Sequence, residues 1–156
     1  MSRIVYKEVV PAVYQAMVGL ERAVAQSGLD KSLLELVRMR ASQINGCAFC
    51  LDMHSKDAIA AGETPQRLVG LSAWREAPFY TERERAALAW TERVTQLGPD
   101  GISDDDYDSA RKMFDERELV NLTAAVIAIN GWNRLAIAFH SPEAGSHVAA
   151  TSPRNR

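Results

Sequence analysis

The sequence predicts an all-α protein, and three observations lead to this fold class. Apolar residues recur at three- and four-residue steps through most of the chain, most clearly at Leu119, Leu122, Val126 and Ile129. Residues that begin or end helices separate these segments. No run of β-branched residues alternates with polar ones between turn signals, so no strand is expected.

The periodic segments predict helices that are joined by short turns. We expect them at 11–26, 31–43, 47–61, 65–74, 82–97, 104–114 and 116–139. Ser32 with Glu35, and Thr81 with Glu84, have the spacing of a capping box, and Ser103 precedes three aspartates that suit a helix N-terminus. The prediction is therefore one helical domain of about six to seven helices, with the last segment as the central core helix.

The length and composition predict one compact domain. The chain has 156 residues, of which 47% are hydrophobic, and this is enough for one ordinary core. We expect the domain to cover residues 1–139. The segment after Phe139, HSPEAGSHVAATSPRNR, has no apolar period and is rich in turn-forming residues. It predicts a flexible C-terminal tail over 140–156, in which His140 and His147 are solvated.

The charge balance argues against polyanionic partners. With 18 Lys and Arg against 20 Asp and Glu, the net charge is −2, so no global field attracts nucleic acid or an anionic membrane. No stretch reaches the ~18 consecutive apolar residues of a membrane span, and the N-terminal MSRIVYKEVV lacks the apolar run of a secretory signal. A cytoplasmic location is expected.

The only two cysteines lie close together in the stretch NGCAFCLDMH. In a reducing cytosol such a pair is usually catalytic or metal-binding. Asn45 and Gly46 break the preceding helix and place Cys47 at the start of a new one, where the free N–H groups stabilise a thiolate. Cys50 is at i+3 from Cys47, and His54 is at i+4 from Cys50, so the three side chains form a column on one helix face.

Glu35 joins this column if the helices on either side of the turn are antiparallel. At ~1.5 Å per residue, Glu35 lies ~16 Å from the turn and His54 ~13 Å, so the two can sit side by side. The order Glu35, His54, Cys50, Cys47 follows the logic of an activated nucleophile, in which a carboxylate orients an imidazole that deprotonates a thiol. The capping-box spacing with Ser32 offers a competing role for the same carboxylate.

The spacing of Glu35, Cys47, Cys50 and His54 within LLELVRMRASQINGCAFCLDMH resembles the signature of the AhpD-like alkylhydroperoxidases, in the carboxymuconolactone decarboxylase superfamily. The likeness is densest from about Ser32 to Gly62, and IAINGWNRLAIAF resembles the closing helix of that family. One departure is Phe49, where peroxidase members can carry a second histidine. This leaves the peroxidase rate and the electron donor open.

The resemblance implies an all-α homo-oligomer, for which we expect a trimer or hexamer, that reduces hydroperoxides with a CxxC redox pair. It implies that Cys50 attacks the peroxide, that Cys47 resolves the oxidised thiol, and that Glu35 with His54 relays protons. A dithiol or lipoyl-type protein would then reduce the disulfide, and no metal, flavin or nucleotide cofactor is needed. The physical chemistry of the residues alone leaves the roles of the thiols open, because the helix start favours Cys47 as the thiolate and His54 favours Cys50.

Other interpretations of the same residues remain at this stage. The cysteines can be a buried pair of small hydrophobic residues, or they can form a zinc site with His54 and Glu35 in a non-enzymatic redox-sensing or zinc-binding module. A lactone decarboxylase of the same superfamily needs no cysteine pair. A thioredoxin-like protein would place its CxxC after a strand, and none is expected here.

Overall fold

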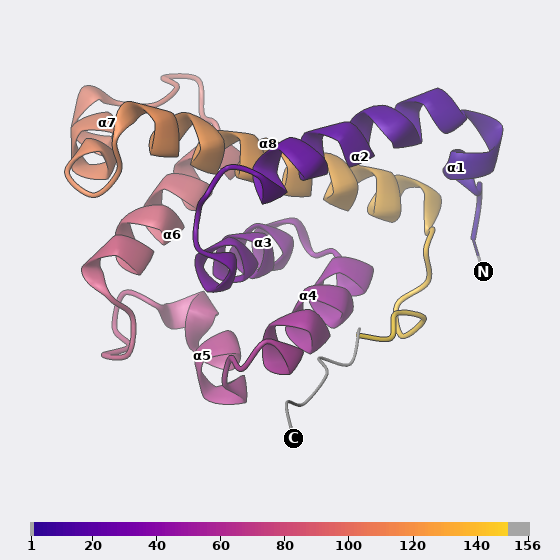
Figure 1. Ribbon diagram of the computed structural model, residues 1–156, viewed down its shortest axis with the longest axis horizontal. Coiled ribbons are helices and arrows are strands. Elements are labelled where there is room, and N and C mark those ends of the chain that lie inside the picture. The colour runs from indigo at the N-terminus through magenta and orange to yellow at the C-terminus, as the bar shows by residue number, and fades with distance from the viewer. Residues whose placement is uncertain (1, 150–156) are drawn as a thin grey trace.

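The computed structural model describes residues 2–149 and is helical throughout (Figure 1). Within these residues there are eight α-helices and one 3-10 helix, and the only β-type pairing is an isolated bridge between Gly98 and Gly101. The elements are α1 (Tyr6–Val9), α2 (Pro11–Ala25), α3 (Lys31–Asn45), α4 (Ala48–Ala60), α5 (Pro65–Gly70), η1 (Leu71–Ala73), α6 (Glu82–Thr95), α7 (Asp104–Arg111) and α8 (Glu116–Phe139).

The predicted all-α fold class is confirmed, and the helix count differs for two local reasons. The short helix α1 has no apolar period of its own, and the expected helix 65–74 divides into α5 and the tighter turn η1. The capping box of Thr81 and Glu84 is present at the start of α6, and Ser103 caps α7. The bounds of α8 agree with the sequence prediction.

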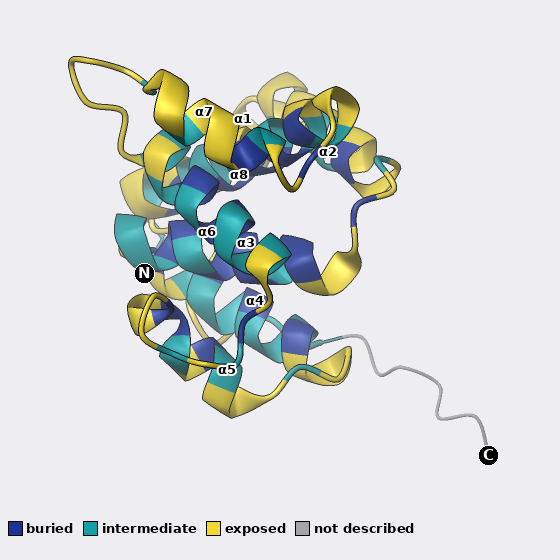
Figure 2. Cartoon of the chain, turned by 90° about the vertical axis from the view of Figure 1, so that its left-hand side faces the viewer, coloured by how far each residue is buried: buried dark blue, intermediate teal, exposed yellow. Residues whose placement is uncertain are grey.

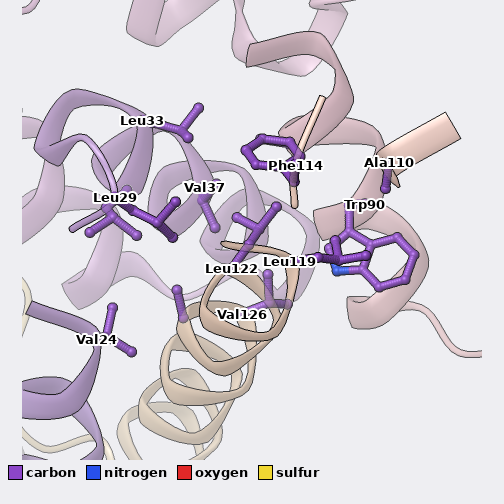
Figure 3. Close-up of a cluster of buried hydrophobic side chains, with 13 residues drawn as sticks. Val24, Leu29, Leu33, Val37, Trp90, Ala110, Phe114, Leu119, Leu122 and Val126 are labelled. Atoms are coloured by element: carbon purple, nitrogen blue, oxygen red, sulfur yellow. The ribbon is translucent and has the colours of Figure 1, made fainter. Parts of the chain in front are cut away.

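Helix α3 lies at the centre of the fold and packs against α4, α6 and α8, while α2 runs along α8 (Figure 1). Figure 2 shows that the buried residues gather around α3 and α8, whereas α2 is largely exposed. The main apolar cluster, drawn in Figure 3, joins α3, α6 and α8 through side chains such as Val37, Trp90, Leu122 and Val126. Burial of this surface is the main force that holds the helices together.

Helix α8 is long and apolar enough to cross a membrane by length and composition, and it is the one such helix among the described residues. It packs against α2, α3, α4 and α6, and its buried side chains include the polar Asn133. These contacts are those of a core helix. Gly131 faces α2, where the Cε of Met17 occupies the space next to it, 2.7 Å from the position that a Cβ would take.

A chain of hydrogen-bonded side-chain amides joins the end of α3 to α8. The Nδ2 atom of Asn45 donates to the Oδ1 atoms of Asn130 and Asn133, at 2.9 and 2.8 Å. Asn133 is fully buried and donates in turn to the hydroxyl of Ser42 at 3.0 Å. Asn130 also donates to Thr95 of α6 at 2.9 Å. These interhelical hydrogen bonds of Asn130 and Asn133 fix the end of α3 against α8.

The segment that follows α8 turns back toward α4, in yellow in Figure 1. Its backbone N–H at Gly145 donates to Asp52, and Lys56 donates to the carbonyl of His147 at 3.0 Å. His147 Nε2 lies 2.7 Å from the Asp57 carboxylate and its side chain is 24% exposed, so His147 is paired and only partly solvated. The sequence pattern misses this contact because its partners come from α4, about 90 residues away in the sequence. Residues 150–156 of the predicted tail lie outside the described residues.

The amide chain leads to a prediction about stability. The Asn133→Ala variant should lower the free energy of unfolding by about 1–3 kcal/mol, because Asn45 and Ser42 each lose a buried partner. Urea denaturation followed by circular dichroism measures this change. The matched control is Arg117→Ala at an exposed position of the same helix, outside the amide chain, which should change stability by less than about 0.5 kcal/mol. Equal effects of the two substitutions would contradict the structural role of the amide chain.

Candidate active site

The turn between α3 and α4 sets the position of the cysteines. Gly46 has a φ of 70°, which is in the left-handed region that glycine adopts without steric cost, and it ends α3. Cys47 follows as the N-cap of α4, and its Sγ accepts a hydrogen bond from the backbone N–H of Cys50 at 3.3 Å. The predicted place of Cys47 at the start of a helix is therefore confirmed.

The two cysteines are joined in a disulfide, with their Cα atoms 5.3 Å apart. Each residue is only 1% exposed, and the pair packs against Ala41 of α3 and Ile129 and Ala136 of α8. Cys47 as the N-cap and Cys50 in the first turn of α4 stand at i and i+3, so the start of this helix brings the two sulfur atoms together. The fold therefore holds the two cysteines close enough to form a disulfide.

His54 and Glu35 meet as the helical-hairpin geometry predicts. The Nδ1 atom of His54 lies 2.9 Å from the Oε2 atom of Glu35, and both side chains are largely buried. Glu35 does not cap its own helix, because Asp30 is the N-cap of α3 and accepts from the N–H of Leu33 at 3.0 Å. The capping role that the Ser32 spacing offered is therefore wrong, and the carboxylate is available to the histidine.

The pairing of His54 and Glu35 continues into a chain of alternating charges that reaches α2. Arg38 donates to Glu35 Oε1 at 2.7 Å and to Glu21 Oε2 at 2.9 Å. The indole N–H of Trp132 donates to the other oxygen of Glu21 at 3.2 Å. We call His54, Glu35, Arg38 and Glu21 the charge chain. It links α4, α3 and α2, and each charged group in it has a partner of opposite sign or a hydrogen-bond donor.

The surroundings of Glu35 keep it ionised. Burial alone would raise the pKa of this carboxyl, but the hydrogen bond and charge of His54 and then the charge of Arg38 outweigh burial, and the net pKa is lowered. A carboxylate that accepts from Nδ1–H of His54 selects the tautomer in which Nε2 carries the lone pair. The other ring nitrogen of His54 is then a proton acceptor.

Cys50 and His54 open onto the same pocket, which we call the Cys50 pocket. Its volume is about 330 Å³, and apolar and aromatic side chains make up most of its wall. It lies among α1, α2, α3, α4, α8 and the segment that follows α8, and its lining residues are Tyr6, Tyr14, Glu21, Arg38, Phe49, Cys50, Met53, His54, Trp132, Ala136 and Pro142. A cysteine and an imidazole in one apolar pocket make it the candidate reaction site.

Cys47 opens onto a different pocket, which we call the Cys47 pocket. It has a volume of about 440 Å³, and its walls come from the α3–α4 turn, the end of α8 and residues 140 and 142–144. Only Ala136 and Pro142 line both pockets. The two cysteines of one disulfide therefore line separate pockets.

The structure brings together all four candidates that the sequence predicts. Glu35 pairs with His54, Cys50 shares a pocket with His54, and Cys47 is joined to Cys50. The zinc site that the sequence leaves open would need both sulfur atoms as ligands, but they are bonded to each other. Within residues 2–149, no group of three or more His, Cys, Asp and Glu side chains is placed to hold a metal ion.

Sequence reasoning missed Arg38, Glu21 and Trp132. Arg38 stands at i+3 from Glu35, so its place on the same helix face could have been found from the sequence. Glu21 and Trp132 are separated by 111 positions, and no local pattern joins them. Phe49, the departure from the family pattern, lies in the wall of the Cys50 pocket.

Comparison with known proteins places the chain in a family. The model of the carboxymuconolactone decarboxylase family matches residues 11–93. An uncharacterized protein of Bacillus subtilis, YdfG, is 40% identical over 137 residues, which cover 88% of this chain and 93% of that protein. The alkyl hydroperoxide reductase AhpD of Rhodopseudomonas palustris is 46% identical over 39 residues, which cover 25% of this chain and 22% of that protein.

Solved structures show the same fold. A protein of unknown function from Agrobacterium tumefaciens, described as an AhpD-type antioxidant defence protein, has a TM-score of 0.86 and 43% identity, and the match covers 90% of this chain and 97% of that one. The debrominase Bmp8 has a TM-score of 0.74 at 22% identity over 84% of this chain and 70% of that one, so it shares the fold. The chain belongs to the carboxymuconolactone decarboxylase family and is an AhpD-like member of it.

Proposed function

We propose that the protein is a thiol-dependent hydroperoxide reductase, with an AhpD-like peroxidase (peroxiredoxin) activity. One observation carries this proposal. The disulfide-forming Cys50 shares an apolar pocket with His54, and the Nδ1 atom of His54 is paired with the ionised carboxylate of Glu35. A buried thiol that serves only in packing needs no such partner. Membership in an AhpD-like family and the name of the R. palustris relative support the same chemistry.

In the oxidising half-reaction the Cys50 thiolate attacks the terminal oxygen of the hydroperoxide. The O–O bond breaks, the alkoxide takes up a proton and leaves as alcohol, and Cys50 becomes a sulfenic acid. The Cys47 thiolate then attacks the Cys50 sulfur and expels hydroxide, which leaves as water after protonation. The product is the Cys47–Cys50 disulfide, so the peroxide is reduced by two electrons and the thiol pair is oxidised by two.

His54 supplies the proton transfer in this scheme. Its Nε2 accepts the thiol proton of Cys50 and returns it to the leaving oxygen, while Nδ1–H stays bonded to Glu35. Glu35 stabilises the imidazolium form, and Arg38 and Glu21 hold the carboxylate in place. Glu21 and Arg38 are therefore positioning residues, since they act through Glu35.

A dithiol donor completes the cycle by reducing the disulfide. The donor is expected to be a small dithiol or a lipoyl-type group on a protein, because the scheme needs two electrons and no other cofactor. Cytoplasmic location and a homo-oligomeric state, trimer or hexamer, remain predictions. Exposed apolar side chains of α1 and α2, such as Val9 and Val13, support burial of this face against another copy of the chain.

The cysteine roles can be tested by two substitutions. Cys50→Ser should lower the turnover of cumene hydroperoxide with excess dithiol to the uncatalysed rate, because no other thiol faces the peroxide. In the absence of dithiol, Cys47→Ser should reduce one equivalent of hydroperoxide and accumulate a sulfenic acid that dimedone labels stoichiometrically, because no second thiol of the pair displaces the hydroxide. Mass spectrometry of the labelled protein identifies the modified residue. Full turnover by Cys50→Ser would show that the nucleophile is assigned wrongly.

The role of His54 can be tested apart from turnover. In a Cys47→Ser background only Cys50 can be alkylated, and His54→Ala should lower its alkylation rate at neutral pH and remove the pH step that the imidazole causes. The rate of iodoacetamide labelling between pH 5 and about pH 9 measures both effects. His140→Asn is the matched control, because it removes a histidine outside the charge chain and asparagine tolerates the left-handed backbone at this position. An unchanged profile in His54→Ala would exclude it as the base.

The lowered pKa of Glu35 predicts how stability depends on pH. A group whose folded pKa lies below its ordinary value of 4.5 stabilises the fold above that value, and this contribution is lost as the pH falls through the lower folded pKa. The wild type should therefore exceed Glu35→Gln in free energy of unfolding by more at pH 7 than at pH 3. Urea denaturation at both pH values measures the difference. The exposed Glu76→Gln variant controls for the loss of a charge as such.

A further inference from the structure

We propose that the reductant and the hydroperoxide reach the Cys47–Cys50 disulfide by different routes, the hydroperoxide through the Cys50 pocket and the reductant through the Cys47 pocket. This inference rests on the proposed function and adds the docking site of the electron donor. The reductant is a dithiol on a narrow arm or a free small dithiol. Its first target is the sulfur of Cys47.

The access of each sulfur atom supports two routes. Both cysteines are 1% exposed, so a thiol cannot reach either one except through a pocket. Cys50 lines the apolar pocket that holds His54 and has no part in the wall of the Cys47 pocket, whereas Cys47 lines the Cys47 pocket and has no part in the wall of the Cys50 pocket. A thiolate attacks a disulfide along the extension of the S–S bond, from the side away from the leaving sulfur. Attack on Cys47 therefore begins on the side of Cys47 that is away from Cys50 and the substrate pocket.

Pro142 and Ala136 form the partition between the two pockets. Ala136 belongs to the rigid helix α8, but Pro142 belongs to the segment that docks on α4. Hydrogen bonds from Gly145 to Asp52 and from Lys56 to the His147 carbonyl hold this segment in place. The ion pair of His147 with Asp57 adds a third contact. The packed segment keeps the two openings separate.

The hydrogen bonds of the cysteines favour the same order of attack. The first thiolate of the donor forms a bond to Cys47 Sγ, the S–S bond breaks, and Cys50 leaves as a thiolate beside His54, which can protonate it. The second thiolate of the donor then attacks its own sulfur in the mixed disulfide and expels Cys47. That leaving thiolate accepts the backbone N–H of Cys50 at the start of α4. The donor ends as a cyclic disulfide, and the two electrons restore both thiols.

The size and lining of the Cys47 pocket favour a slender donor. Its volume is about 440 Å³, and its lining includes the small residues Gly46, Ala48 and Ala144. A thiol on the folded surface of a large protein would have to bring that surface into the pocket to reach a sulfur that is 1% exposed. A dihydrolipoyl arm carries its dithiol on a flexible chain and meets no such obstacle.

The test measures the two half-reactions separately. Reduction is followed with dihydrolipoamide on protein whose disulfide has been formed with diamide, and oxidation is followed with cumene hydroperoxide on the reduced protein. Ala144→Trp fills the Cys47 pocket, and Met53→Trp is its matched counterpart in the Cys50 pocket. Ala144→Trp should slow reduction by about tenfold or more and leave oxidation unchanged, and Met53→Trp should show the reverse, because the rate of exchange follows access to the sulfur. Circular dichroism confirms that both variants fold.

Any other pattern of reduction and oxidation rates in the two variants overturns the proposal. Slow reduction in Met53→Trp with normal reduction in Ala144→Trp would assign both reactants to the Cys50 pocket. A second measurement needs no variant. The product alcohol 2-phenyl-2-propanol should inhibit oxidation and leave the rate of reduction unchanged, whereas inhibition of both rates would contradict separate routes. Failure of the proposed function is a distinct outcome, because hydroperoxide would then fail to form the disulfide while its reduction by dihydrolipoamide could still be measured.

Discussion

The hydrogen bonds of Asn45 to Asn130 and Asn133 fix the point at which α3 ends, and the positions of the reactive groups follow from that point. Gly46 then turns the chain in the left-handed conformation, so that Cys47 becomes the first residue of the next helix turn. Helices α3 and α4 run antiparallel from this anchored turn, so Glu35 and His54 lie at a similar distance from it and face each other. A shift of this turn by one residue would rotate α4 by about 100° and move Cys50 out of its pocket.

The parts of the structure that the sequence predicts are those set by local period and spacing. The apolar stripe of α8 and the column of Cys47, Cys50 and His54 depend only on 3.6 residues per turn. The meeting of Glu35 with His54 needs one further assumption, an antiparallel hairpin about a short turn. These predictions hold because the same helical geometry that defines the pattern also places the side chains.

The features that the sequence does not reveal depend on contacts between distant segments. Asp30 caps α3 in place of Ser32, since the helix begins one residue before that serine and its N-cap position therefore falls on Asp30. The docking of the segment around His147 depends on Asp52, Lys56 and Asp57 of α4, a helix that is far from it in sequence. The separate pockets of the two cysteines depend on that docking, so they appear only once the fold is complete.

The charge chain has a consequence for how this site can change in evolution. Glu21, Arg38 and Glu35 alternate in sign on two helices, and each side chain is at most 28% exposed. Loss of any one of them leaves a poorly solvated neighbour without its partner, which is costly in a weakly polar environment. Substitutions at these positions should therefore be accepted in pairs rather than singly. In a lineage that replaces Arg38 by a neutral residue, Glu21 would have no ion-pair partner on α3. The sequence of helix α2 would then be less constrained at this position.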